Sequence, residues 1–139
     1  MKTITTRFGE VEYDPANLLH FPTGLIGFPQ LHDFVVMPNT KEGPLFWIQS
    51  VDDSDIAFVL TDPSNFFLDY AILPDQTERQ QLQISGEDQC FILAVVTVPR
   101  NRDITLNLSA PILFAPKTNR ALQIIVDDPR YTTKTPLPN

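Results

Sequence analysis

Short apolar stretches separated by turn residues follow one another along almost the whole chain. Apolar and polar side chains alternate at residues 3–8, 10–13 and 104–108, which is typical of strands with one buried face. Residues 90–98 are almost wholly apolar and β-branched, which predicts a central strand buried on both faces. Further strands are expected at residues 34–37, 45–51, 56–61, 112–115 and 121–126.

One segment has the composition of a helix, because residues 77–82 follow Pro74 with good helix formers in series. Thirteen prolines, spread along the chain, favour strands and turns elsewhere. With strands at a spacing of roughly ten residues, this predicts a mainly β protein. We expect a single-domain antiparallel β-barrel or sandwich-like fold with one short helix. The domain is expected at residues 1–126, and the polar, proline-rich residues 127–139 as an exposed C-terminal tail.

The net charge of the chain limits the kinds of partner that we expect. The chain has 17 acidic and 10 basic residues and a net charge of −7. This charge repels phosphate, so we expect no direct contact with nucleic acid. It attracts a basic protein surface, although acidity also serves solubility alone. The single Cys90 fits a reducing compartment, and no signal peptide or membrane-spanning stretch is apparent, so we expect a cytoplasmic protein without membrane contact.

Side chains suited to catalysis or metal binding are few. Two histidines, His20 and His32, and one cysteine do not make a usual structural zinc site. The acidic residues 52–55 lack the Gly and the Glu that follow at fixed positions in an EF-hand loop. The glycine motifs of nucleotide-binding proteins and of hydrolases are absent from the sequence. We therefore expect no catalytic residue, metal or cofactor, and interpret the chain as a binding protein rather than an enzyme.

The loop at residues 22–28 carries large apolar side chains among two Gly and a Pro, which give it a defined shape. Leu25, Ile26 and Phe28 are either anchors for a partner or plugs beneath a barrel.

Four segments, in their order and spacing, resemble the FliW family of flagellar assembly factors. The segments are residues 7–11 with 21–28, residues 46–53 with 56–58, residues 93–99, and residues 105–112 with 121–123. The resemblance extends over residues 4–126.

The resemblance implies a small, mostly antiparallel β-barrel-like domain that is not an enzyme. Proteins of this family bind newly made flagellin in the cytoplasm. They also bind CsrA, a small basic dimer that represses translation of flagellin messenger RNA. By this resemblance, binding to CsrA relieves the repression without occupying the RNA site, and accumulated flagellin sequesters the family member and frees CsrA.

Three segments are candidate contacts with these partners. They are the apolar loop with Leu25, Ile26 and Phe28, the acidic turn with Asp52, Asp53 and Asp55, and the outward-facing Thr105 and Asn107. Three alternatives stay open: a flagellin chaperone without a regulator contact, a β-barrel that binds a small ligand, and an enzyme that uses His20 or His32. Large side chains at most inward positions predict a filled barrel, which disfavours the small ligand.

Overall fold

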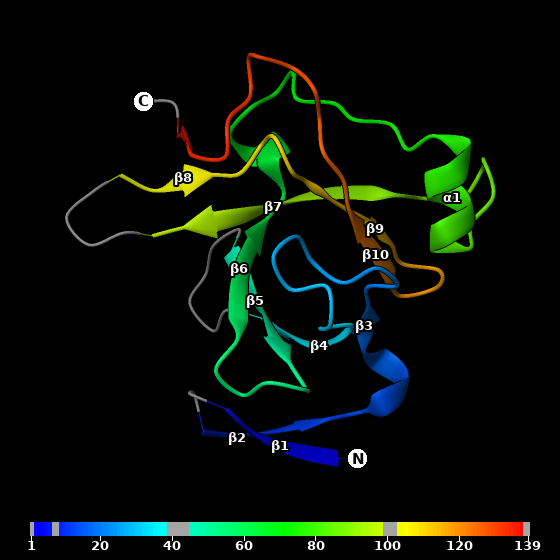
Figure 1. The fold of residues 1–139 in the computed structure, drawn as a ribbon, viewed down its shortest axis with the longest axis vertical. Coiled ribbons are helices and arrows are strands. Elements are labelled where there is room, and N and C mark those ends of the chain that lie inside the picture. Colours follow the sequence, from blue (N-terminus) through cyan, green and yellow to red (C-terminus); the bar gives the residue numbers. More distant parts are fainter. Residues whose placement is uncertain (1, 7–8, 39–44, 99–102, 138–139) are drawn as a thin grey trace.

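A computed structural model of the protein describes residues 2–6, 9–38, 45–98 and 103–137, and this part is mainly β (Figure 1). The strands are β1 (Lys2–Thr6), β2 (Gly9–Tyr13), β3 (Leu19–His20), β4 (Asp33–Pro38), β5 (Leu45–Ser50), β6 (Ala57–Thr61), β7 (Phe91–Thr97), β8 (Thr105–Leu106), β9 (Ile112–Ala115), β10 (Arg120–Gln123) and β11 (Thr135–Pro136). The helical segments are the short 3-10 turns η1 (Pro15–Asn17) and η2 (Pro63–Asn65) and the α-helix α1 (Gln76–Leu82).

Seven of the strands close into a ring. Their order is β7-β6-β5-β4-β3-β10-β9, and β9 pairs back onto β7 to complete the barrel. The neighbours in this ring are antiparallel, except that β3 and β10 run parallel through His20 and Arg120. The mainly β, barrel-like fold with one short helix is thus confirmed for the described residues, and one parallel pair is added to the expected antiparallel pattern.

Strand β7 is the central strand that the apolar run predicted. Its residues Phe91–Leu93 pair with β9, and Val96 and Thr97 pair with β8. On the opposite edge, residues 94–96 pair with β6. Leu93 belongs to the apolar cluster inside the barrel and Ala94 to a cluster outside it, so both faces of the strand are covered.

The barrel interior forms the main core. Alternate side chains of the strands point inward and pack together, which is the side-chain periodicity of a strand. The buried members are Leu19, Phe21, Leu25, Leu31, Phe34, Ile48, Leu60, Leu93, Ile112 and Ala121. Two smaller clusters lie outside the ring, one beneath the segments around β8 and the other beneath α1.

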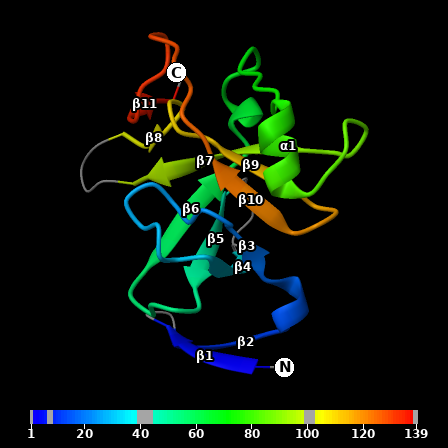
Figure 2. The same ribbon diagram turned by 45° about the vertical axis from the view of Figure 1, so that its right-hand side comes forward.

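Helix α1 begins and ends at defined caps. The side chain of Asp75 accepts a hydrogen bond from the Glu78 N–H at 2.7 Å, and the Glu78 side chain accepts from the Asp75 N–H at 2.9 Å. This reciprocal capping box is a common helix start. Gln83, with φ +58°, ends the helix. Leu82 is fully buried in the cluster beneath the helix, which places α1 beside β9 and β10 (Figure 2).

The β1–β2 hairpin and strand β11 lie on opposite sides of the barrel (Figure 2). Strands β1 and β2 pair in register as the predicted N-terminal hairpin and form a separate two-stranded sheet (Figure 1). Arg7 and Phe8, which the predicted strand included, are outside the described residues. The hairpin leads through η1 into β3 and thus into the ring.

Most described residues of the C-terminal segment are exposed, and part of the segment packs on the barrel. Thr135 and Pro136 form β11 and pair with β8. The ring of Tyr131 packs edge-on against Tyr70, with centroids 4.8 Å apart. Leu137 covers the same outer cluster, while residues 138–139 are not described. These two apolar residues hold the segment on the barrel, although most of its sequence is polar.

The buried hydroxyl of Tyr70 ties this outer cluster to the backbone, because it donates to the Leu108 carbonyl oxygen at 2.7 Å. Burial, and secondarily the neighbouring Tyr131, raises the pKa of Tyr70 above its ordinary value. The unfolded chain then releases this proton first, from about pH 10. The native state holds more protons above that pH, so the free energy of unfolding falls as the pH rises.

Replacing Tyr70 with Phe should lower the free energy of unfolding by about 1–2 kcal/mol near neutral pH, because the Leu108 carbonyl loses its donor. The difference from wild type should shrink above about pH 10. Urea denaturation across this range measures both effects, with Tyr13→Phe as the control. Parallel pH profiles for wild type and Tyr70→Phe would contradict the assignment.

Candidate functional site

The apolar loop at residues 22–28 plugs the barrel. Leu25 is buried within the inner core. Phe28 is half-buried and meets the Phe58 ring in an edge-to-face contact, with centroids 5.6 Å apart. Ile26 is the member that points to solvent, with 53% of its surface exposed. Of the two roles that the sequence allowed, the structure gives Leu25 and Phe28 the plugging position, and a partner contact through the exposed Ile26 stays a prediction.

Backbone contacts fix the shape of this loop. The N–H of Leu25 donates to the Phe28 carbonyl at 3.2 Å, and the Phe28 N–H donates back at 2.8 Å. Gly27 has φ +88°, which glycine adopts without a steric penalty. The Ile26 N–H donates to the Gln123 side chain at 2.8 Å, and that side chain in turn donates to the Ala110 carbonyl at 3.0 Å. The exposed Ile26 is therefore presented from a tethered backbone.

The acidic turn between β5 and β6 presents exposed carboxylates on an ordered backbone. Asp52, Asp53 and Asp55 are all exposed. The hydroxyl oxygen of Ser50 accepts from the N–H groups of Asp52 at 3.1 Å and Asp53 at 3.0 Å. The Asp53 carboxylate accepts from the Asp55 N–H at 3.0 Å. Such local side-chain bonds hold a turn in one conformation.

Gln49 supports the acidic turn from inside the protein. Its side chain is fully buried. Its amide nitrogen lies 3.0–3.3 Å from the carbonyl oxygens of Ser50, Asp53, Ser54 and Ile56. Because an amide nitrogen carries two hydrogens, these contacts share two donors among several acceptors. The turn is thus closed around one buried amide, while the carboxylates point outward.

Thr105 and Asn107 are half-buried, although the alternation placed them outward. Thr105 lies in β8, where it pairs with Thr97 on one side and Pro136 on the other. The side-chain oxygen of Asn107 accepts from the Ala110 N–H at 3.0 Å and from the Ser109 hydroxyl at 3.2 Å. Asn107 therefore shapes the turn after β8, and a role for these two residues in partner contact stays a prediction.

The candidate segments do not converge on one surface. The acidic turn joins β5 and β6 at the end of the barrel near the β1–β2 hairpin, whereas β8 lies toward the opposite end (Figures 1 and 2). The loop meets the acidic-turn end through Phe28 and Phe58, because Phe58 lies close to the start of β6. The Ile26 backbone is instead linked through Gln123 to Ala110, whose N–H donates to Asn107.

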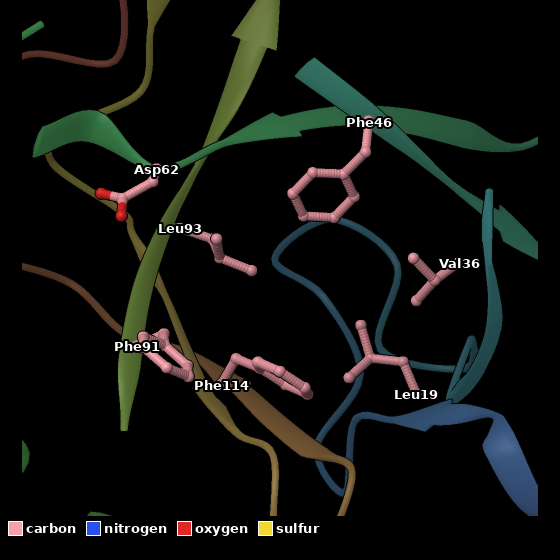
Figure 3. A pocket seen from close by; sticks show the side chains of 7 residues that line it. All are labelled: Leu19, Val36, Phe46, Asp62, Phe91, Leu93 and Phe114. Carbon is pink, nitrogen blue, oxygen red and sulfur yellow. The ribbon is translucent and has the colours of Figure 1, made fainter. Parts of the chain in front are cut away.

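The structure also has a site that the sequence did not predict, an apolar hollow of about 460 Å³ at the other end of the barrel (Figure 3). The large inward side chains predicted a filled interior, but the strands leave this mouth open. We call it the barrel mouth. Its lining comes from strands β3, β4, β5, β7 and β9 and from the residue that follows β6. The lining residues are Leu19, Val36, Phe46, Asp62, Phe91, Leu93 and Phe114.

The residues considered for catalysis have structural neighbours. His20 Nδ1 lies 2.8 Å from the Asp33 carboxylate, and His32 Nδ1 donates to the Phe21 carbonyl at 2.8 Å. Burial raises the pKa of the Cys90 thiol, which leaves less of the nucleophilic thiolate near neutral pH. Within the described residues, no three Asp, Glu, His or Cys side chains gather as a metal site. No helix in the described part of the chain is long and apolar enough to cross a membrane.

Comparison with known proteins gives one consistent result. A family model described as "FliW protein" matches residues 2–137. "Flagellar assembly factor FliW 2" of Desulfotalea psychrophila is 65% identical over 99% of this chain and 91% of its own length. "Flagellar assembly factor FliW" of Syntrophotalea carbinolica is 63% identical over 99% and 98% of the two chains.

A solved structure agrees with these relatives. The "Crystal structure of the flagellar assembly factor FliW" superposes with a TM-score of 0.88 at 31% identity, and the match covers 99% of this chain and 98% of that one. The sequence matches and the shared fold both extend over nearly the whole length, so the chain belongs to the FliW family.

Proposed function

We propose that this chain is a flagellar assembly factor that acts in the cytoplasm by binding proteins and not by catalysis. Its partners are flagellin and the translational regulator CsrA. By binding CsrA it relieves repression of flagellin synthesis, and accumulated flagellin draws it away again. The observation that carries this proposal is family membership across residues 2–137, together with relatives named as flagellar assembly factors.

The acidic turn is the surface best suited to a basic partner such as CsrA. Its three carboxylates are exposed, and Ser50 and Gln49 hold its backbone in place. A charged group that is already positioned loses little conformational freedom on binding. Complementary charge also steers association, and this effect is strongest at low ionic strength.

Replacing Asp52, Asp53 and Asp55 together with Ser should weaken binding to CsrA roughly tenfold at low salt, with a smaller effect at physiological salt. Titration calorimetry against purified CsrA at both salt concentrations measures this. The matched control replaces the exposed acids Asp69, Glu87 and Asp127 with Ser, which changes the net charge equally. Equal affinities for the two triple variants would remove the acidic turn from the interface.

Wild-type titrations decide the wider proposal. Saturable binding of both CsrA and flagellin supports the partner switch. Binding of flagellin alone would favour the chaperone alternative, in which no regulator is contacted. A folded protein that binds neither partner would contradict the proposed function.

A further inference from the structure

The barrel mouth exposes apolar side chains to solvent without a covering segment among the described residues. Val36 and Phe91 are large apolar residues that each keep 45% of their surface exposed. Phe46 and Phe114 are half-buried and line the same hollow. In Figure 3 these side chains stand around an open centre, supplied by strands from opposite sides of the ring. An exposed apolar concavity of this kind marks a binding surface.

The mouth is open because neighbouring strands separate at this end. Strand β6 stops at Thr61, so it pairs with residues 94–96 of β7 but not with Phe91–Leu93. Strand β3 pairs with β4 only at Asp33 and Phe34, so Val36 lies beyond that pairing. The opening therefore results from where the neighbouring strands stop pairing, and not from small side chains at the mouth.

One carboxylate belongs to this apolar lining. Asp62 Oδ1 accepts from the Ser64 N–H at 2.9 Å and from the Ser64 hydroxyl at 2.7 Å, which fixes the side chain. Within the part of the chain that the structure describes, no donor reaches its Oδ2. A second hollow, lined in part by Glu12 and Asp14, shares Val36 with the mouth. One carboxylate thus lies in the lining of the mouth, and two more line the neighbouring hollow.

We propose that the barrel mouth receives an aromatic or branched apolar side chain from a partner protein, next to a basic residue whose cation meets Asp62. This inference rests on the proposed function, because it assumes that the chain acts by binding proteins. Small-molecule sites hold their ligands with several convergent polar groups, whereas the described lining of the mouth offers one carboxylate. An apolar anchor in a pocket, with charge at its border, is the usual arrangement of a protein interface hot spot.

The chemistry of the mouth is tested without either partner protein. Phenethylamine places an ammonium next to an aromatic ring, and 3-phenylpropionate places a carboxylate next to the same ring. Methyl NMR titration of the wild-type protein with each probe should shift the signals of Leu19, Val36 and Leu93. Phenethylamine should bind at least about fivefold more tightly, as expected for opposite against like charge near Asp62. Absent or scattered shifts, or equal affinity for the two probes, would overturn the proposal.

Variants separate the charge from the apolar surface. Asp62→Asn keeps the acceptor for Ser64 and should abolish the preference for phenethylamine, whereas Asp75→Asn at the cap of α1 should preserve it. Val36→Phe should fill the mouth and weaken binding of both probes roughly tenfold. Ile125→Phe alters an exposed apolar residue that does not line the mouth and should leave binding unchanged. A Val36→Phe variant that is folded and binds like wild type would contradict the assigned position.

The partner proteins complete the test. Val36→Phe should reduce the affinity for CsrA or for flagellin by roughly 30-fold, the loss expected for an interface hot spot. If wild type binds both partners and Val36→Phe binds both equally well, the inference fails while the proposed function stands. If wild type binds neither CsrA nor flagellin, the proposed function fails. These two proteins are then also excluded as partners of the mouth, whatever the probes show.

Discussion

Replacing Gly24 with Ala should lower the free energy of unfolding by about 3 kcal/mol or more. Gly24 has φ +71°, a conformation that side chains disfavour by about 1–2 kcal/mol. A Cβ at this position would also lie 2.5 Å from the carbonyl oxygen and 2.6 Å from the Cα of Pro29. These are backbone atoms, so the clash is relieved only by a shift of the backbone around Gly24 and Pro29.

Gly27 provides the matched control, because it lies in the same loop with φ +88° but a Cβ there would meet no atom within 4 Å. Gly27→Ala should therefore lower the free energy of unfolding by only about 1 kcal/mol, because just the unfavourable backbone conformation contributes. Urea denaturation, followed by the fluorescence of Trp47, compares the two variants directly. Equal losses of stability would mean that the close approach of Pro29 does not constrain the loop.

Gln49→Met should destabilise the protein by about 2–3 kcal/mol. The substitution keeps a similar side-chain volume but removes the buried amide that donates to the backbone carbonyls of the acidic turn. Carbonyls left without a donor in the interior carry a desolvation penalty of about 1–3 kcal/mol. Part of the loss is offset because the Gln49 side-chain oxygen has no hydrogen-bond partner among the described residues.

Hydrogen exchange locates the effect of Gln49→Met. The amides of Ser50 and Ile56, which donate within the turn, should exchange faster in the variant than those of α1. Gln30→Met, at an exposed position, is the control and should change neither stability nor exchange. A turn that stays equally protected in Gln49→Met would show that Ser50 suffices to hold it.

Local sequence patterns predicted the elements that are stabilised by contacts between residues close together in the sequence. Alternation predicted the β1–β2 hairpin, and the helix formers after Pro74 predicted α1, which Asp75 caps. The predicted strand at residues 104–108 is shorter, because Asn107 turns its side chain onto the Ala110 N–H and ends β8 after Leu106. Alternation of side chains does not reveal such a side-chain bond, because Asn fits the polar side of the pattern equally well.

Features that join distant segments could not be predicted in this way. The loop composition allowed both roles for Leu25 and Phe28, and only the position of Phe58 decides between them. The barrel mouth draws its lining from strands far apart in the sequence, so no local motif marks it. The polar composition of the C-terminal segment did not indicate that Tyr131 would pack against Tyr70.

The parallel contact between β3 and β10 has a consequence for synthesis of the protein. His20 is made long before Arg120, so β3 lacks this neighbour until 100 further residues have been made. Contacts between residues so far apart form slowly, because a long loop must close first. A nascent chain that ends before β9 would also lack Ile112 and Ala121 from its interior. Closure of the ring is therefore a late step of folding that waits for β9 and β10, and partner binding that needs the closed ring follows it.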